Sequence, residues 1–224
     1  MTIYHYLPNA KYTQIGLIMK KQTTDEIITF LKENIEPLTD NIYGNRYRAS
    51  VYLVDGTYLP CVIFQNSENL TQLALKRFED ERNRKTLFGP NPHEYKEIVK
   101  HFVTSGNRIN EFDIAKVEIS KYAFPVDILK QIKGETTMGW TGFSAKMKDG
   151  KYVGFGTSFL MEFFELPDNY TADDIVEIIN HSYVLPDGTL CEHKLPFFAN
   201  LNDNYKTAVI NKSRPFFECY LEDL

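Results

Sequence analysis

The sequence predicts an α+β fold with a mainly antiparallel sheet, built from hairpins with about four to five interspersed helices. Three observations predict this class. Asp-Gly pairs separate runs of alternating β-branched and aromatic residues. Helix-capping residues precede segments whose apolar side chains recur at helical spacing, and no Pro-, Gly- or Ser-rich linker divides the chain. Hairpins mixed with helices are typical of the α+β class.

The first two helices are predicted from their capping residues. Thr23 and Glu26 form a capping box, so we expect a helix from there to about residue 34. Ser67 is expected to cap a second helix, and the segment KRFEDERNRK (76–85) continues it. Acidic and basic side chains alternate there at i, i+4 spacing, which favours a solvent-exposed, salt-bridged helix end.

Three further helices are predicted later in the chain. Asn91, followed by Pro92 at the first helical position, opens a helix to about residue 104. The segment TADDIVEIIN (171–180) has apolar residues at helical spacing after a capping Thr. PVDILKQIK (125–133) is a shorter candidate. FLMEFFEL (159–166) is also interpreted as helical, because a helix gathers Glu162 and Glu165 on one polar arc.

Three tight turns predict three hairpins. Their central residues are Asp55-Gly56, Asp149-Gly150 and Pro186-Asp187-Gly188. Helix, hairpin and helix therefore follow one another twice along the chain, which raises the hypothesis of two similar helix–hairpin–helix halves. With no linker in 224 residues, we expect a single compact domain over 1–224, and a seam, if one exists, near 105–110.

The composition of the chain indicates its cellular environment and the kinds of partner it can bind. The hydrophobic share of 43% and the charged share of 25% are typical of globular proteins. A net charge of −5 argues against a polyanionic partner. The three cysteines, Cys61, Cys191 and Cys219, are odd in number and far apart, which indicates reduced thiols. No signal peptide or membrane-spanning apolar run is recognised, so we expect a cytoplasmic protein without a membrane partner.

The segment HSYVLPDGTLCEHKL (181–195) carries the main candidate for a metal site. A three-residue loop pairs Leu185 with Thr189, and counting outward then brings His181, Cys191 and His193 onto one face. Two imidazoles and a thiolate are acceptable zinc ligands. A two-residue turn would shift the register by one and disperse the cluster. A packed face that simply buries these side chains is the other interpretation, because free Cys often behaves as a small hydrophobe.

Two other groups of polar residues are candidate sites. His93, Glu97 and His101 stack on one helix face, but the spacing does not match the HExxH zinc pattern, and we interpret this face as solvated. Basic residues form the candidate nucleic-acid surface, although acidic residues are interleaved with them; they are Arg46, Arg48, Arg77, Arg82 and Arg84.

Standard catalytic signatures are absent from the sequence: there is no phosphate-binding GxxxxGK[ST], no GxGxxG and no GxSxG. The leading hypothesis is therefore a non-catalytic intracellular protein-interaction module, such as an inhibitor, an accessory subunit or an immunity-type binder. Abundant Tyr and Phe support it, because aromatic side chains are enriched in interfaces. The alternative is a metal-assisted hydrolase acting on phosphodiesters, with the zinc ligands named above and Asp187 or Glu192 as base.

Overall fold

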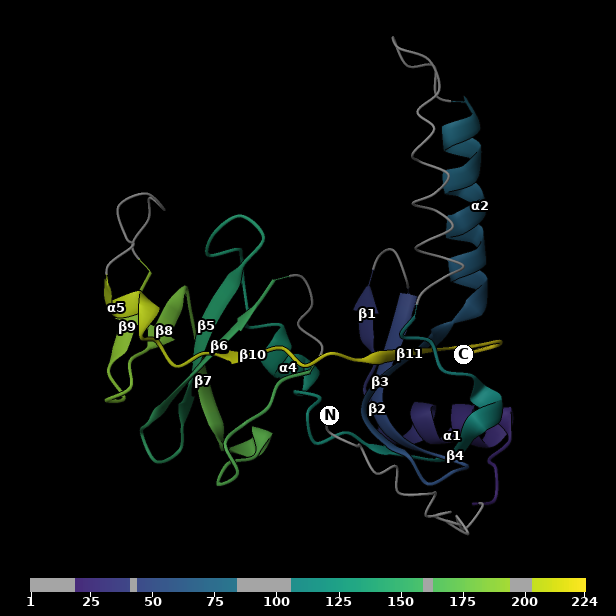
Figure 1. Ribbon diagram of the computed structural model, residues 1–224, viewed down its shortest axis with the longest axis horizontal. Coiled ribbons are helices and arrows are strands. Elements are labelled where there is room, and N and C mark those ends of the chain that lie inside the picture. The colour runs from purple at the N-terminus through teal and green to yellow at the C-terminus, as the bar shows by residue number, and fades with distance from the viewer. Residues whose placement is uncertain (1–18, 41–43, 84–105, 159–162, 194–202) are drawn as a thin grey trace, which may run out of the picture.

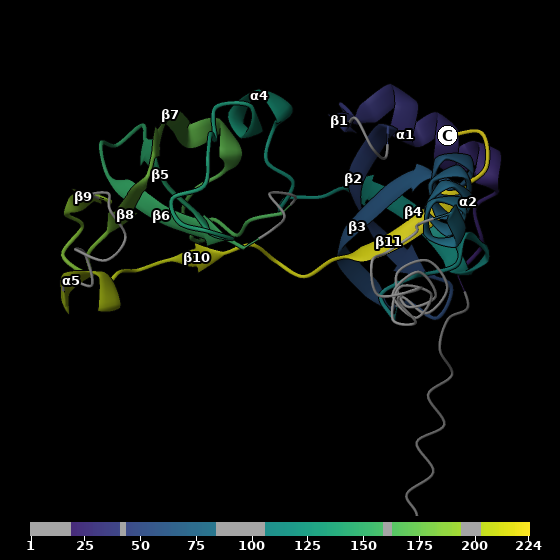
Figure 2. The same ribbon diagram turned by 90° about the horizontal axis from the view of Figure 1, so that it is seen from above.

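The computed structural model describes residues 19–40, 44–83, 106–158, 163–193 and 203–224. They form two lobes that lie side by side, each with its own β-sheet and hydrophobic cluster (Figure 1). The view from above shows the same separation, with β10 and β11 following one another along the segment that returns from the second lobe to the first (Figure 2).

The first lobe is a five-stranded sheet with helix α1 (Thr24–Asn34) packed on one face. Its order is β1-β2-β3-β11, and β4 also pairs with β2. Only β11 runs parallel to its neighbour. Ile27 and Leu31 of α1 lie fully buried against Val62 and Phe64 of the sheet. The strands are β1 (Leu38–Asp40), β2 (Gly44–Leu53), β3 (Tyr58–Asn66), β4 (Ile114–Ile119) and β11 (Phe217–Leu221).

Both N-terminal helices begin where the sequence predicts. In α1 the capping box is formed: the Thr23 amide donates to Glu26 Oε2 at 2.8 Å, and the Glu26 amide donates to Thr23 Oγ1 at 3.2 Å. The second helix, α2, spans Ser67–Asn83. Its capping bond comes from Asn66 rather than Ser67, because Asn66 Oδ1 accepts from the Glu68 amide at 2.7 Å.

The second lobe is a four-stranded sheet around a cluster of phenylalanines. Its order is β10-β6-β5-β7, with β10 parallel to β6 and the other pairs antiparallel. The rings of four buried phenylalanines contact one another with centroids 5.2 to 5.6 Å apart; they are Phe124, Phe143, Phe155 and Phe164. The strands are β5 (Thr141–Met147), β6 (Tyr152–Thr157), β7 (Ile175–Asn180) and β10 (Asn211–Lys212).

The third sheet is a short hairpin at the outer end of the second lobe. It consists of β8 (Ser182–Val184) and β9 (Leu190–Glu192), beside the one-turn helix α5 (Asp203–Lys206). Two glycines of β6 allow close packing here. A Cβ at Gly154 would lie 2.6 Å from the Val209 carbonyl oxygen, and a Cβ at Gly156 would lie 2.1 Å from Cζ2 of Trp140. These positions therefore exclude larger side chains.

The three predicted Asp-Gly hairpins are confirmed, and they use one turn geometry. In each, a backbone amide donates across a three-residue loop, as from Leu185 to the Thr189 carbonyl at 2.9 Å. Each loop ends in a glycine with φ between +84° and +86°, the left-handed region that favours glycine. Each turn aspartate also accepts from the amide two residues later at 2.9 to 3.1 Å, which fixes the turn locally.

The predicted number of helices is wrong. The described residues contain eleven strands in three sheets, and only α1 and α2 exceed a single turn. The segment 171–180 forms a short 3-10 turn and then β7, because its run of β-branched residues pairs with β5. The described part of the second half therefore contains no helix longer than one turn, although two similar halves would require one.

Two other helix predictions are corrected as well. The segment 125–133 contains only the single-turn helix α4 (Val126–Leu129). Residues 163–166 are not helical, because Phe163 and Phe164 are both fully buried in different hydrophobic clusters and so point in different directions. The helix expected at 91–104 lies outside the described residues, as does Glu162.

The two lobes meet through a third hydrophobic cluster. Cys61 and Ile63 of β3 are buried with Phe163 from the second lobe, and Tyr122, Ala123 and Phe216 pack around them. Leu38 of β1 also packs against the second-lobe cluster. The chain crosses between the lobes twice, once between β4 and α4 and once between β10 and β11. A single compact domain stays a prediction, which unfolding experiments can test.

Candidate functional site

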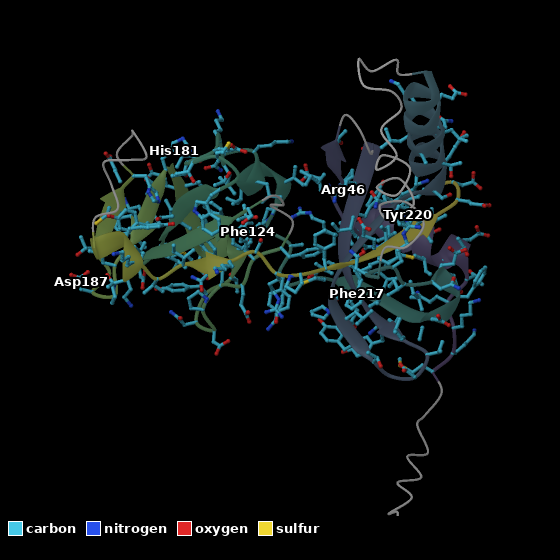
Figure 3. All side chains as sticks on the ribbon, turned by 45° about the horizontal axis from the view of Figure 1, so that its top comes forward. Arg46, Phe124, His181, Asp187, Phe217 and Tyr220 are labelled. Atoms are coloured by element: carbon cyan, nitrogen blue, oxygen red, sulfur yellow. The ribbon has the colours of Figure 1, made fainter. Side chains whose placement is uncertain are left out.

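The hairpin of β8 and β9 has the register that the three-residue loop predicts. Ser182 pairs with Glu192, and Tyr183 pairs with Cys191. The His193 amide donates to the His181 carbonyl at 2.7 Å, so the two histidines also lie opposite each other in the backbone. Asp187 lies in the turn at the tip, away from His181 (Figure 3).

The two imidazole rings nevertheless have different surroundings. His181 has a φ of +53°, which interrupts the alternation of side chains, and its Nδ1 lies 3.4 Å from Thr136 Oγ1. The His193 ring instead packs between Tyr183 and Tyr205, with centroids 4.9 and 4.8 Å away. Within the described residues, no group of three or more His, Cys, Asp or Glu side chains is close enough to hold a metal ion. The structure therefore does not bring His181, Cys191 and His193 together as a ligand group, and zinc binding by these residues stays a prediction.

The described residues do not show a basic surface of the kind that the nucleic-acid hypothesis requires. Arg46 and Arg48 lie on β2 and are only 8% and 4% exposed, so they are not presented to a polyanion. The structure does not describe the side chains of Arg77 and Arg82, and Arg84 lies outside the described residues. His93, Glu97 and His101 lie outside it as well.

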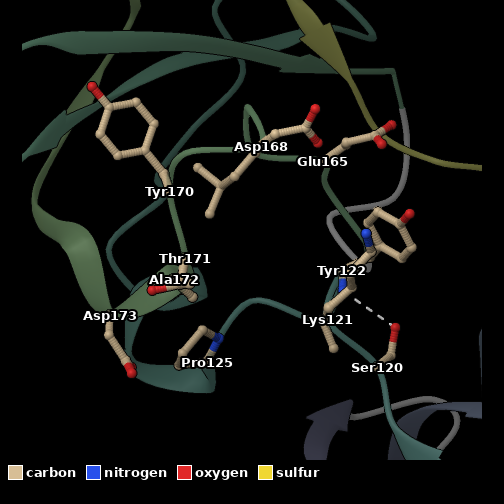
Figure 4. A pocket seen from close by; sticks show the side chains of 12 residues that line it. Ser120, Lys121, Tyr122, Pro125, Glu165, Asp168, Tyr170, Thr171, Ala172 and Asp173 are labelled. Carbon is tan, nitrogen blue, oxygen red and sulfur yellow. Dashed lines mark hydrogen bonds between the residues drawn. The ribbon is translucent and has the colours of Figure 1, made fainter.

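A pocket of about 430 Å³ opens at the junction of the two lobes (Figure 4). One wall is the segment that leaves β4 for α4, and the other is the segment that precedes β7. The Phe164 amide donates to the Tyr122 carbonyl at 2.9 Å and joins the two walls. We call this the junction pocket. It is lined by Ser120, Lys121, Tyr122, Ala123, Pro125, Glu165, Leu166, Asp168, Tyr170, Thr171, Ala172 and Asp173.

The rim of the junction pocket is acidic. Glu165, Asp168 and Asp173 supply three carboxylates, whereas Lys121 supplies one ammonium group. Among the described residues neither Asp168 nor Asp173 forms an ion pair, and both are exposed. In Figure 4, Asp168 and Asp173 lie on different sides of the opening. The arrangement favours a positively charged ligand.

Two residues of the lining, Tyr122 and Glu165, already bind a guanidinium group that is not itself part of the lining. Arg214 stacks on the Tyr122 ring, with its Cζ 4.1 Å from the ring centroid, and its Nη1 forms an ion pair with Glu165. On the other side, the Tyr170 hydroxyl donates to Asp149 at 2.8 Å. This hydrogen bond is the main reason why the pKa of Asp149 is lowered, and it fixes the Tyr170 ring in the lining.

No membrane-spanning helix is present within the described residues, since none is both long and apolar enough. Comparisons with known protein families, with curated proteins and with solved structures returned no match. The function of the chain therefore has to be argued from its own residues.

Sequence reasoning missed most of the junction pocket. It singled out Glu165 as a polar residue in an apolar run, but it had no signal for Tyr122, Tyr170 or Asp168. These residues belong to two segments that are far apart in the chain, and the segments meet because Phe124 and Phe164 pack in the same hydrophobic cluster. The Phe163 and Phe164 pair was the available signal, since two buried rings on opposite sides of an extended segment indicate a junction.

Proposed function

We propose that the protein is a non-catalytic interaction module, and that the junction pocket receives a basic side chain of a partner protein. The observation that carries this proposal is the pocket itself, about 430 Å³ in volume, with two exposed carboxylates, Asp168 and Asp173, that form no ion pair among the described residues. The third carboxylate of the lining, Glu165, is already paired with Arg214. A lysine or arginine side chain that enters it meets tyrosine rings on its walls and carboxylates at its rim.

The internal contact of Arg214 supports this chemistry. A guanidinium group over an aromatic face gains about 0.5 to 2 kcal/mol, depending on its desolvation. Tyr122 and Glu165 make this pair of contacts with Arg214, and Tyr170 with Asp168 or Asp173 offers the same combination of ring and carboxylate to an incoming group.

The polar groups of the lining favour binding over catalysis. The Ser120 hydroxyl, the best-buried polar group there, donates to the Pro60 carbonyl at 2.6 Å and accepts from the Tyr122 amide at 3.3 Å. A serine that donates to a backbone carbonyl is not activated as a nucleophile, since activation requires an adjacent base.

The cysteines support an intracellular location, which is part of this proposal. All three are free thiols. Burial raises the pKa of Cys61 to about 11 and that of Cys219 to about 12, so both stay protonated and unreactive. Unpaired, buried thiols are typical of proteins in reducing compartments.

The test is a titration with N-acetyl-arginine amide, followed by backbone amide signals in NMR. We expect a dissociation constant on the order of 1 mM, with the shifts confined to the junction pocket. The double variant Asp168→Asn/Asp173→Asn is expected to weaken binding roughly 2- to 25-fold, as for two exposed ion pairs.

The matched control is Asp25→Asn/Glu33→Gln, which makes the same change of net charge on α1 and leaves the pocket intact. It is expected to bind as the unmodified protein does. Equal weakening in both variants would show that the probe responds only to net charge, and the proposal would then fail.

A further inference from the structure

Three polar atoms from different segments converge beside Gly142 of β5. A Cβ at this glycine would lie 3.4 Å from Nε1 of Trp140, 3.4 Å from Nε2 of His193 and 3.6 Å from the carbonyl oxygen of Ser182. Trp140 precedes β5, Ser182 begins β8, and His193 follows β9. Because residue 142 has no side chain, the space between these atoms is kept open.

Nε1 of Trp140 and Nε2 of His193 are both buried, and neither atom forms a hydrogen bond with a described residue. The Tyr205 hydroxyl interacts with the Trp140 indole, but the two groups do not meet hydrogen-bond geometry. A buried polar group without a partner costs about 1 to 3 kcal/mol. Two such groups facing one small space indicate that a third, polar group joins them.

We propose that Trp140, His193 and Ser182 form a binding site for one ordered water molecule. The water accepts from the indole N–H of Trp140 and donates to the Ser182 carbonyl and to Nε2 of His193. An indole offers only a donor and a carbonyl only an acceptor, so a group that both accepts and donates is required. Three hydrogen bonds are the usual number for a buried water.

The water assigns a tautomer and a structural role to His193. If Nε2 accepts a hydrogen bond, the proton of the neutral ring lies on Nδ1. The bridge also links the loop before β5 to both strands of the β8–β9 hairpin at its open end. It therefore holds the third sheet onto the second, next to the ring contacts of His193 with Tyr183 and Tyr205.

The single tryptophan of the chain makes this testable, because its indole N–H gives one unambiguous NMR signal. We expect a direct cross-peak between this proton and water, and a His193 ring protonated at Nδ1. Gly142→Ala places a methyl group in the space and is expected to abolish the cross-peak. Gly106→Ala is the control, since a Cβ there has no neighbour within 4 Å.

Other results would overturn the proposal. A scalar coupling between the Trp140 and His193 nitrogens would show a direct hydrogen bond instead. A cross-peak that disappears in Tyr205→Phe would show that it was relayed by the tyrosine hydroxyl. The proposal can be tested even if Gly142→Ala does not fold. Absence of the cross-peak in the unmodified protein is sufficient to reject the water.

Discussion

His193 is a partly buried base whose protonation opposes folding. Burial lowers its pKa, and the nearby His181 lowers it further. The groups that face its ring are Tyr183, Tyr205 and His181, and none of them supplies a negative charge at neutral pH. The folded state therefore binds this proton less readily than the unfolded chain does.

The expected consequence is a loss of stability at mildly acidic pH. The free energy of unfolding should fall as the pH drops below the unfolded pKa of about 6.5 toward the lower folded pKa. Urea unfolding of the unmodified protein and of His193→Gln at pH 7.5 and pH 5.5 measures this. The variant should show a smaller pH dependence, and an unchanged dependence would contradict this account of His193.

Gly156 is the residue on which the Trp140 ring rests. The variant Gly156→Ala should destabilise the protein by about 1 to 3 kcal/mol, because the new methyl group would overlap the indole. Emission from the only tryptophan should shift to longer wavelength as the ring moves outward. Gly106→Ala is expected to change neither quantity, and equal effects in the two variants would refute the packing argument.

Elements set by local chemistry were predicted well. The Asp-Gly turns, the capping box of α1 and the register of the β8–β9 hairpin all depend on residues within a few positions of one another. The segment 171–180 was predicted wrongly because its isoleucines fit helical spacing as well as a strand. Pairing of β7 with β5, which the local sequence does not encode, decides between them.

The capping box of α1 gives a prediction for a single element. Thr23→Ala removes the side chain that accepts from the Glu26 amide and should cost about 1 kcal/mol. Thr29→Ala is the control, because Thr29 is an exposed residue inside the same helix, where alanine has the higher helix propensity. Chemical denaturation should show a loss only for Thr23→Ala. A comparable loss for both variants would contradict the capping role.

At the scale of the whole molecule, Phe163 couples the two lobes. It is fully buried and packs against Cys61 and Ile63 of the first lobe. We expect the unmodified protein to unfold in one calorimetric transition, and Phe163→Ala to lose about 3 to 5 kcal/mol and to unfold in two. Phe155→Ala is the control, because it creates a cavity within the second-lobe cluster and leaves the contact between the lobes intact. Two transitions in the unmodified protein would contradict the coupling.

Long-range packing also explains why the candidate site could not be predicted from the sequence. The walls of the junction pocket, 120–125 and 165–173, belong to segments that no local pattern connects. Composition favours the hypothesis of an interaction protein, but it does not indicate where a partner would bind. The position of the site depends on Phe163 and Phe164 entering different clusters, a long-range property of the folded chain.

The most direct test of the central claim compares two probes that differ in charge alone. N-acetyl-arginine amide and N-acetyl-citrulline amide have nearly the same shape, but only the first is a cation. We predict that the arginine probe shifts the amide signals of Lys121, Tyr122, Asp168 and Tyr170 in a saturable manner, whereas the citrulline probe leaves them in place. Equal shifts with both probes, or shifts only outside the junction pocket, would contradict recognition of a basic side chain there.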